Sequence, residues 1–437
     1  MRLVIWHTDP YPTAPGVYLD CFPGMGHEVT WVVSERGERN EVVERREAGV
    51  RHFAIRRSPD SRLPRPLGAL SNRWDKLIGF FLKVRLMERL ARTRPDVLQV
   101  RDLVTEGLLA LWAARRHGVR FAYQLDHPHF EGRLVNLDLG DRGWVLERLV
   151  LRCWILLRRV VLRGADLVFP ISVALGEILR DREGVDPRRM VPFQVGVSRS
   201  TFDRGGSGAV DPRAAGLADS PTVCYLGNLE LRRDPGLIFR IFEEVGRRLP
   251  ESRFLIVAQL TDAVRDRMRG LDFAERIQFV PFVPYDEVPA LLRAARVGLY
   301  ALPLGDRYGV NVSCSPLKVV EYMSVGLPVV ASRVRDAEDA LGQSGGGVCV
   351  TNEVGPFADA IETYLREPER ARRDGARGRA WVGTHRLFDV LARDVEAAYQ
   401  RLIESGVPAR SDSPLLASPG SPADAPGDAR PGPGDPR

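Results

Sequence analysis

The stretch that organises this chain is residues 313–332, SCSPLKVVEYMSVGLPVVAS, in which helix signals are followed directly by strand signals. Ser315 suits the N-cap of a helix and Pro316 its first position. Gly326 supplies the left-handed residue that commonly ends a helix. The apolar run 327–332 then predicts a buried strand. A short helix followed by a buried strand is therefore expected here.

Two charged residues fall within the predicted helix. Lys318 lies in its first turn, and Glu321 lies three residues later on the same face. A cation in the first turn opposes the helix dipole at a cost of roughly 0.3–1 kcal/mol, unless a bound anion offsets it. The chain has only three lysines, and lysine is a compact charge that suits a phosphate. The pair predicts a phosphate site; the alternative is that Lys318 reaches solvent and Glu321 is a surface acid.

Composition limits the class of protein. The chain has 437 residues, of which 44% are hydrophobic, so two or three domains with sizeable cores are expected. A net charge of +6 favours anionic partners such as nucleotide phosphates or acidic lipids, and no nucleic-acid-binding motif is recognised. The five cysteines are scattered without a CxxC pair, which indicates neither a disulfide framework nor a zinc site.

The N-terminus is a short apolar segment that reaches His7 at once, without the length or cleavage site of a signal peptide. No uninterrupted apolar run approaches the roughly 20 residues that span a bilayer. A cytoplasmic location is expected.

The first half opens with a strand, a loop, a helix and a second strand. The strands are predicted at residues 3–7 and 26–33, and the loop at residues 9–16. This order is typical of a parallel α/β sheet, whose ligands bind at the carboxyl edge where the first loop lies. Gly16 is the only glycine of that loop, and no GxGxxG is present. A dinucleotide site is therefore weakly supported, while Gly16 is a candidate ligand contact.

Histidines follow a later strand of the same half. Residues 121–125 are predicted to form a buried strand that ends at Asp126-His-Pro-His129. The carboxyl end of a parallel strand favours a ligand contact for His127 or His129. A solvated loop histidine is the alternative for either residue.

Residues 144–163 predict a basic amphipathic helix. At 100° per residue, four arginines share an arc of about 60° and apolar residues spread over the other side. The arginines are Arg148, Arg152, Arg159 and Arg163, and the apolar residues are Leu149, Trp154, Leu156, Leu157 and Val160. Two interpretations stay open: a core helix with a solvated arginine face, or a helix that meets an anionic membrane surface.

The α/β alternation stops near residues 199–220, which are rich in Gly, Ser, Ala, Asp and Pro, and restarts at residue 222. The predicted fold class is α/β, with two doubly wound Rossmann-like domains that face each other across a cleft. The predicted divisions are an acceptor-side domain 1–200, a linker 201–220, a donor domain 221–385, a helix 386–405 that crosses back to the first domain, and a disordered tail 406–437.

Several motifs carry a resemblance to a known family. They are YLGNLELRR at 225–233, RIQFVPFVP at 276–284 and SPLKVVEYMSVGLPVVA at 315–331, with GHEV at 26–29, RPDV at 94–97 and ADLV at 165–168 in the first half. In order and spacing they resemble the retaining glycosyltransferases of the GT-B fold, the group 1 or family 4-like enzymes that include glycogen synthase, sucrose synthase and bacterial mannosyltransferases. The resemblance covers roughly residues 1–403.

The resemblance implies roles for single residues. Glu321 matches the glutamate that binds the donor ribose, Arg233 the basic residue that clamps the diphosphate, and Lys318 the phosphate position at the helix start. His127 best matches the acceptor-domain histidine near the reacting sugar, with His129 second. Further donor contacts are implied at Gly16, Gly227, Asn228, Ser313, Ser315, Pro316 and Leu317.

The chain departs from the family at a few positions. Ser313 stands where a second glutamate often contacts the transferred sugar, so Asp306, Asn311 or Ser313 itself would have to supply that contact. Asn228 replaces an arginine, and Pro15-Gly16 replaces a Gly-Gly pair.

The implied function is retaining transfer of a sugar from a nucleotide diphosphate sugar to a hydroxyl acceptor, in cell-envelope, exopolysaccharide or glycolipid synthesis. The nucleotide sugar is a co-substrate and no cofactor is expected. No metal is expected either, because positive charge and helix N–H groups would balance the leaving diphosphate. Consistent with that, the chain has no Asp-x-Asp, the usual divalent-metal signature of the other main glycosyltransferase fold. The expected partners are a glycan, lipid-linked or small hydroxyl acceptor and an anionic membrane surface at 144–163, with no nucleic acid. A nucleotide-sugar epimerase and a non-catalytic partner subunit of the same fold are the alternatives.

Overall fold

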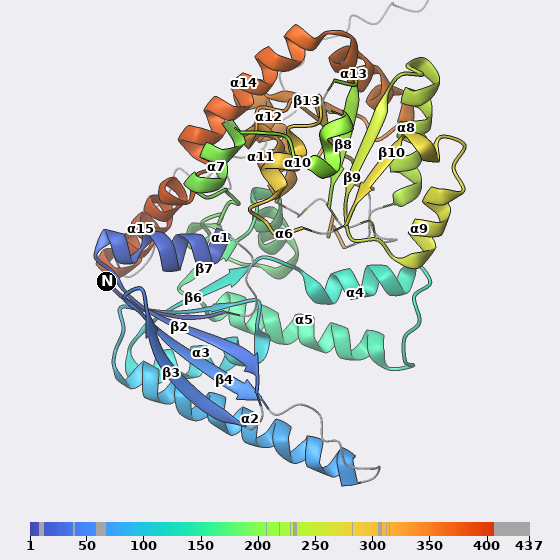
Figure 1. The fold of residues 1–437 in the computed structure, drawn as a ribbon. Helices are drawn as coiled ribbons and strands as arrows, with labels where there is room; N and C mark the ends of the chain where they lie inside the picture. The colour runs from blue at the N-terminus through green and yellow to red at the C-terminus, as the bar shows by residue number, and fades with distance from the viewer. Residues whose placement is uncertain are drawn as a thin grey trace, which may run out of the picture.

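The structure is a computed structural model that describes residues 1–7, 13–37, 40–57, 67–206, 208–217, 219–227, 229, 234–281, 283–304, 308–311, 313 and 315–405. Within these residues the chain forms two β-sheets, one in each half (Figure 1). The predicted positions Asn228, Arg233 and Asp306 and the predicted tail lie outside the described residues.

The N-terminal sheet has the strand order β3-β4-β2-β1-β5-β6-β7. The strands are β1 Arg2–Trp6, β2 Glu28–Arg36, β3 Glu41–Glu47, β4 Val50–Arg57, β5 Val97–Arg101, β6 Arg120–Leu125 and β7 Leu167–Pro170. All neighbours are parallel except β3 and β4. In register, Leu3 of β1 faces Val29 of β2 on one side and Val97 of β5 on the other.

The β3–β4 hairpin was not predicted from the sequence. Its turn places Ala48 and Gly49 at φ values of 48° and 83°, which suits the tight turns of hairpins. Its edge strand is largely exposed and charged, with ion pairs such as Arg51 Nε to Glu44 Oε1 at 2.6 Å. Charged edge strands protect a sheet from pairing with other chains, but they hide the apolar alternation by which strands are recognised.

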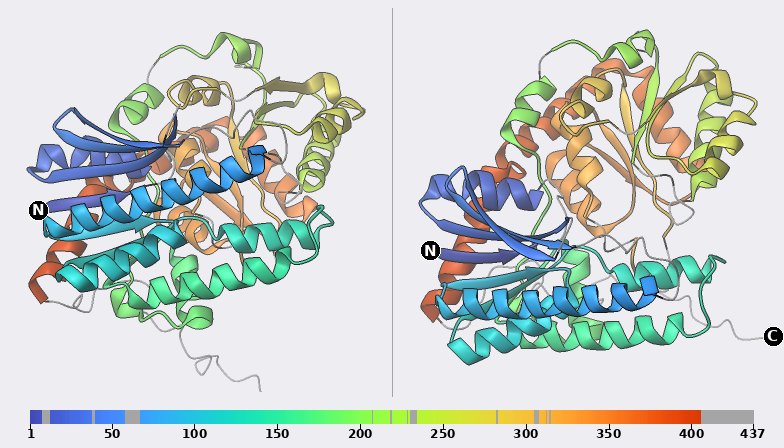
Figure 2. Two further views of the ribbon diagram at one scale, coloured as in Figure 1. Left: turned by 90° about the horizontal axis from the view of Figure 1, so that it is seen from below. Right: turned by 60° about the horizontal axis from the view of Figure 1, so that its bottom comes forward.

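Alternating residues of β1 enter two different cores. Val4 and Trp6 pack into the core that contains residues of α2, α3 and α5, whereas Leu3 and Ile5 pack with residues of η1 and α15. This is the period of two expected for a strand covered on both faces. Figure 2 shows α2 and α5 along the outer side of the N-terminal half. The helices of this half are α1 Thr13–Pro15, the π-helical η1 Gly16–Cys21, the short η2 Pro23–Met25, α2 Leu67–Arg92, α3 Val104–His117, α4 His129–Asp138, α5 Glu147–Gly164, α6 Val173–Glu183 and the short η3 Pro187–Arg189.

The C-terminal sheet is parallel, with the order β10-β9-β8-β11-β12-β13. Its strands are β8 Thr222–Leu226, β9 Arg253–Val257, β10 Ile277–Val280, β11 Val297–Tyr300, β12 Val329–Ser332 and β13 Gly347–Val350. Its helices are α8 Pro235–Arg248, α9 Asp262–Arg269, η6 Ala274–Arg276, α10 Val288–Leu292, α11 Leu317–Ser324, α12 Arg335–Ser344, α13 Val354–Arg366 and α14 Pro368–His385. Numbered along the half, this is the doubly wound order 3-2-1-4-5-6. The predicted fold class of two Rossmann-like α/β domains is confirmed.

The chain crosses between the halves twice. The segment predicted as a linker contains α7 Arg199–Gly206 and η4 Pro212–Leu217, and α15 Phe388–Ser405 returns to the N-terminal half. There, His27 Nε2 lies 2.9 Å from Glu396 Oε1. One face of the N-terminal sheet is therefore covered by segments from both ends of the chain, η1 and α15 (Figure 1). The residue limits of the predicted domains stay a prediction.

Candidate active site

A cavity of about 650 Å³ lies between the two halves. Its C-terminal wall includes Leu226 and Gly227, at the carboxyl end of β8, and Ala301 and Leu302, which follow β11. Strands β8 and β11 are neighbours whose connections leave in opposite directions, so the cavity lies at the topological switch point of the sheet. Open α/β sheets bind their ligands at this point.

Helix α11 borders the cavity, and it begins one residue later than predicted. Pro316 is the N-cap rather than the first helical residue, because its ψ of 59° lies outside the helical range. No side chain caps the helix, so Ser315 does not act as the predicted N-cap. The end was predicted correctly: Gly326, the residue after the C-cap Val325, adopts a φ of 81°. The uncapped start leaves main-chain N–H groups of the first turn available to an anion.

Tyr322 fixes α11 against the sheet. Its hydroxyl accepts a hydrogen bond from the Leu226 N–H at 2.7 Å. Its ring occupies the space that a side chain at Gly298 would need, since a Cβ there would lie 2.5 Å from the ring. Lys318 and Glu321 of the same helix both line the cavity.

Lys318 and Glu321 lie on one face of α11, as predicted. Lys318 Nζ is 3.0 Å from Glu321 Oε2, and the glutamate is only 3% exposed. Glu321 Oε1 has no hydrogen-bond partner among the described residues. The pKa of Glu321 is raised above its usual value, because the effect of burial exceeds the opposing effect of the nearby Lys318. The carboxylate thus lines the cavity with at least one oxygen available to a ligand.

Gly227 lies opposite Lys318. Its φ of 139° is rarely adopted by residues with a side chain, and a Cβ would approach the Lys318 side chain to 3.7 Å. Glycine therefore lets the main chain adopt this conformation close to the lysine.

Ser313 also lines the cavity, but its hydroxyl is already engaged. It is 1% exposed and donates to the Val310 carbonyl at 3.0 Å. The Ser313 carbonyl accepts a hydrogen bond from the Ser172 hydroxyl of the N-terminal half at 2.7 Å. Asn311, the other described candidate for a sugar contact, donates to the Pro303 carbonyl at 3.1 Å and is not part of the cavity lining.

The N-terminal wall is formed by the residues after β6. His127 and His129 both line the cavity and stack with ring centroids 5.4 Å apart. Asp126 and the α4 residues Arg133 and Asn136 also line it, and sequence reasoning missed all three. Asp126 comes directly before His127, at the carboxyl end of β6. Open α/β sheets bind ligands there, so this position could have identified Asp126 as a candidate site residue.

Two further residues of the lining were missed in the second half. Gln259 follows β9, and the Tyr285 hydroxyl is buried with no hydrogen-bond partner among the described residues. Burial raises the pKa of Tyr285 well above its usual value. The phenol is therefore a neutral group that a ligand can meet with a hydrogen bond.

Two predicted donor contacts lie elsewhere. Gly16 is not among the residues that line the cavity; a Cβ at this position would lie 2.2 Å from the Phe388 ring of α15. The close contact with Phe388 leaves no space for a side chain at position 16, which explains the glycine there. Pro316 is buried behind the cavity wall as the N-cap of α11. The structure thus brings together His127, Gly227, Ser313, Ser315, Leu317, Lys318 and Glu321.

The chain resembles known proteins in both halves. The family model "Glycosyl transferases group 1" matches residues 220–367, and "Glycosyl transferase 4-like domain" matches residues 18–196. A GDP-mannose-dependent α-(1-6)-phosphatidylinositol monomannoside mannosyltransferase of Mycolicibacterium smegmatis is 30% identical over 171 residues, which is 38% of this chain and 44% of that protein. A D-inositol 3-phosphate glycosyltransferase of Frankia alni is 26% identical over 301 residues, 64% of this chain and 70% of that protein.

Solved structures share the fold at low sequence identity. Anabaena HepE in complex with UDP and glucose superposes with a TM-score of 0.63 at 12% identity, covering 92% of this chain and 100% of that chain. A UDP-forming α,α-trehalose-phosphate synthase of Burkholderia vietnamiensis gives 0.64 at 15% identity over the same shares. A UDP-N-acetylglucosamine 2-epimerase described as putative, from Listeria monocytogenes, gives 0.55 at 13% identity, so the fold alone does not separate transfer from epimerisation.

The chain spans about half the length, 44%, of the first of these curated relatives, and its two halves match the two domain models in the order and positions of the two sheets. The chain therefore belongs to the group 1, family 4-like glycosyltransferases with the GT-B fold.

Proposed function

We propose that this protein transfers a hexose from a nucleotide diphosphate sugar to a hydroxyl group of an acceptor, with retention at the anomeric carbon. The observation that carries the proposal is the buried Glu321 carboxylate, which faces the cavity with Oε1 unpaired among the described residues. A buried carboxylate is costly unless a ligand supplies hydrogen bonds. A ribose diol offers two hydroxyl donors to one carboxylate.

The diphosphate is proposed to bind at the start of α11. Lys318 supplies positive charge there, the uncapped helix supplies N–H groups, and Gly227 lets the chain approach closely. Arg233, which lies outside the described residues, is proposed as the second cation of this clamp.

The reaction is proposed to proceed by attack from the face on which the diphosphate leaves. The bond between the anomeric carbon and the phosphate oxygen breaks and its electron pair stays on that oxygen. The acceptor oxygen bonds to the anomeric carbon, and its proton passes to the leaving phosphate. Lys318 and the α11 N–H groups stabilise the charge that develops on the leaving group. His127, on the opposite wall, is proposed to contact the reacting sugar.

Metal independence is part of the proposal. Lys318, Arg233 and the N–H groups of α11 are proposed to balance the negative charge of the leaving diphosphate without a divalent ion. The chain also lacks Asp-x-Asp, the usual divalent-metal signature of the other main glycosyltransferase fold.

The relatives suggest the first substrates to examine. One is named for GDP-mannose and a phosphatidylinositol monomannoside, and the other for D-inositol 3-phosphate. We propose a lipid-linked acceptor of the cell envelope, because a second structural feature favours it.

That feature is the outer face of α5. The sequence left two interpretations open, and the core-helix interpretation is wrong for part of the helix. Leu149, Leu156 and Val160 are 58%, 56% and 54% exposed, while Arg158 turns inward and donates to Glu131 Oε2 at 2.9 Å. The exposed leucines and valine lie between arginines on one side and the buried face on the other. Such a mixed surface suits an anionic membrane surface.

The same end of the N-terminal half approaches the cavity. Helix α4 contributes Arg133 and Asn136 to the cavity wall and runs alongside α5 to their shared turn (Figure 1). At that turn Trp144 and Val145 are 56% and 97% exposed. We propose that the membrane meets this turn and α5, so that a lipid-linked acceptor enters along α4. Within the described residues, no helix is long and apolar enough to cross a bilayer, so a peripheral attachment is proposed.

The proposal is tested with the purified protein, GDP-mannose or UDP-glucose, and either phosphatidylinositol mannoside lipid or D-inositol 3-phosphate, with and without EDTA. Formation of a glycosylated acceptor with retained anomeric configuration in both conditions is expected. Conversion of the donor sugar without acceptor would instead indicate an epimerase. Calorimetry that detects no nucleotide binding would indicate a non-catalytic partner subunit.

A further inference from the structure

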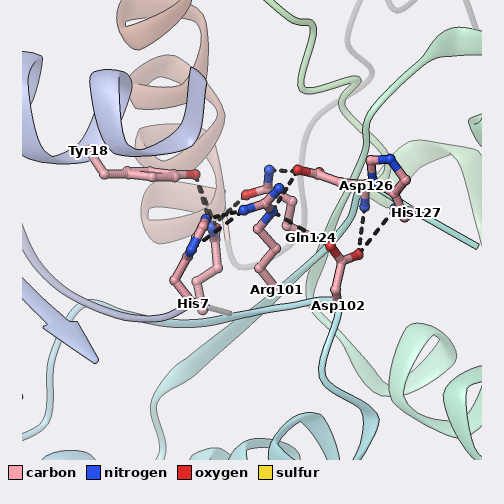
Figure 3. Close-up of polar contacts among 8 residues, drawn as sticks. His7, Tyr18, Arg101, Asp102, Gln124, Asp126 and His127 are labelled. Atoms are coloured by element: carbon pink, nitrogen blue, oxygen red, sulfur yellow. Dashed lines mark hydrogen bonds and ion pairs between the residues drawn. The ribbon is translucent and has the colours of Figure 1, made fainter. Parts of the chain in front are cut away.

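A chain of buried polar side chains lies beneath the N-terminal wall of the cavity (Figure 3). Its members come from the carboxyl ends of β1, β5 and β6 and from η1. They are His7, Tyr18, Gln99, Arg101, Asp102, Gln124, Asp126 and His127. Only the last two line the cavity. The other six residues do not line the cavity; they form the hydrogen-bonded layer behind Asp126 and His127.

Asp102 holds the main chain of both wall residues. Its Oδ1 atom accepts the N–H of Asp126 at 2.8 Å and the N–H of His127 at 3.3 Å. Its own N–H donates to the Gln124 carbonyl at 2.9 Å, and its side chain is 4% exposed. One buried carboxylate oxygen therefore fixes two successive peptide groups of the wall.

The backbone of Asp102 is itself unusual. Its φ of 57° lies in the left-handed region, which costs free energy for a residue with a side chain, although Asp and Asn tolerate it best. Sparsely populated backbone conformations persist where the surrounding structure enforces them, and they gather at functional sites. Here the conformation aims the carboxylate at the two N–H groups.

The Asp126 side chain has hydrogen bonds of its own, and one of its partners, Arg101 Nε, also lies 3.7 Å from Asp102 Oδ2. Arg101 Nε donates to Asp126 Oδ2 at 2.6 Å, and Gln124 Nε2 donates to Asp126 Oδ1 at 2.8 Å. Arg101 is in turn within hydrogen-bond reach of the His7 ring, which is stacked on Trp31 at 4.6 Å. Since the side chain has these anchors, loss of Asp102 would release the main chain at His127 while Asp126 stays paired.

We propose that Asp102 is a positioning residue for sugar transfer, which acts by fixing the main chain that presents His127 to the cavity. The inference rests on the proposed function, because His127 is a wall residue proposed to contact the reacting sugar. A displacement of about 1 Å in a reacting geometry can cost roughly 100-fold in rate. Donor binding should be spared, since the donor residues belong to the other half of the chain.

Two substitutions separate positioning from folding. Asp102→Gly removes the carboxylate but accepts a positive φ without strain, so the turn is retained. Asp102→Asn keeps an acceptor oxygen and also tolerates this conformation. Burial, followed by the charge of Asp126, raises the pKa of Asp102 to about 7, so a neutral amide resembles a form that the native residue already populates near neutral pH.

A matched control exists at the opposite end of the same strand. Asp166 Oδ2 accepts the N–H of Phe121 at the start of β6, at 2.9 Å. Asp166→Ala therefore removes the same kind of carboxylate-to-backbone contact from β6, far from the cavity. It reports what general weakening of this sheet does to activity.

The experiment measures kcat for transfer from GDP-mannose or UDP-glucose, the KM for the donor, the Kd of the matching nucleoside diphosphate, and the thermal unfolding midpoint. Asp102→Gly is expected to lower kcat by ~10- to 100-fold with the nucleotide Kd unchanged, Asp102→Asn to recover most of kcat, and Asp166→Ala to retain it. Each of three results would overturn the inference. The glycine variant could have the kcat of the native protein, or the asparagine variant could be as slow as the glycine variant. In the third, kcat would fall in parallel with the unfolding midpoint, and equally in the glycine and Asp166 variants. Absence of transfer by the native protein would overturn the proposed function and this inference with it.

Discussion

Lys318 Nζ lies 3.0 Å from Glu321 Oε2 across one turn of α11, so the only cation of this helix and its only buried acid are paired with each other. The pair is incomplete, because Oε1 of the glutamate is unpaired among the described residues and the lysine side chain is 32% exposed. A donor that carries both a diphosphate and a ribose can complete both partners. The two residues should therefore respond to different parts of the same ligand.

Glu321 is expected to affect any ligand that carries a ribose. Glu321→Ala should weaken binding of both the nucleoside and the nucleoside diphosphate by at least ~100-fold, because two hydrogen bonds to a charged group contribute roughly 1.5–3 kcal/mol each. Calorimetry with guanosine, GDP, uridine and UDP measures the effect. Glu251→Ala, an exposed acid of the same half, is the control. Native affinity in the Glu321 variant would refute the ribose assignment.

Lys318 is expected to affect only phosphate-bearing ligands. Lys318→Gln should weaken nucleoside diphosphate binding by ~10-fold or more, since a charge-assisted hydrogen bond is lost, and leave nucleoside binding unchanged. The ratio of the two dissociation constants in the variant and in the native protein is the measurement. An equal loss for nucleoside and diphosphate would mean that the lysine only supports Glu321.

The elements of this site were predictable to different degrees, for physical reasons. Lys318 and Glu321 are three positions apart and Gly326 follows their helix, so local spacing was sufficient to place them on one face. The start of α11 was placed one residue early because the ψ of Pro316 depends on its tertiary setting. The packing of Gly16 against Phe388 was not predictable, because Phe388 lies near the other end of the sequence. Local patterns cannot indicate such a contact.

The orientation of α5 also could not be read from the sequence. Its apolar residues cover more than half of the helix, so either side could have faced the sheet. The structure decides by pairing Arg158 with Glu131 and Glu183 inside, which leaves Leu156 and its neighbours exposed. The two carboxylates come from other helices, so the spacing of residues within α5 could not predict that its arginine is buried.

The exposed face of α5 is expected to bind anionic membranes. Replacing Leu149, Leu156 and Val160 together by serine should abolish sedimentation with phosphatidylglycerol vesicles, while folding is retained because these side chains are already exposed. Arg148→Glu with Arg152→Glu should weaken binding by about 1 kcal/mol or more per residue, more strongly at low salt. Ile403→Ser, an exposed apolar residue of α15, serves as control. Vesicle binding that survives both sets of changes would refute this surface.

Acid should destabilise the protein partly through His7. Burial, and then the charge of Arg101, lowers the pKa of His7 from 6.5 to about 2. The unfolded chain therefore binds a proton below pH 6.5 that the folded chain excludes, so stability falls as the pH decreases from about 6.5 towards 2. For this residue the loss is about 1.4 kcal/mol per pH unit.

The prediction is checked by urea unfolding of the native protein and of His7→Gln between pH 7 and pH 5. Glutamine keeps a hydrogen-bond acceptor for Arg101 but does not titrate. The variant should lose less stability over this range than the native protein does. The comparison removes the contribution of groups such as Asp102, whose raised pKa has the opposite effect, a loss of stability as the pH rises towards 7. Equal slopes for the two proteins would show that folding does not lower the pKa of His7.

Asp336 of α12 is expected to control how closely the two halves approach. Its Oδ1 and Oδ2 atoms accept the N–H groups of Val173 and Ala174, at 3.1 Å and 3.3 Å, at the start of α6 in the other half. A carboxylate at a helix N-terminus is stabilising, and this one joins the two halves near the contact between Ser172 and Ser313. Asp336→Ala should therefore favour a more open arrangement and raise the donor KM, because residues of both halves line the cavity.

Small-angle scattering, with and without GDP or UDP, measures the opening, and steady-state kinetics measure the donor KM. Asp339→Ala is a matched control, because Asp339 lies one turn along the same helix and pairs with Arg335 Nε of that helix at 3.0 Å. The radius of gyration of the Asp336 variant should exceed that of the control both with and without nucleotide, because the proposed nucleotide contacts all belong to the C-terminal half and cannot restore the lost contact with α6. If the two variants scatter identically and share one donor KM, the contact between Asp336 and α6 does not govern the approach of the halves.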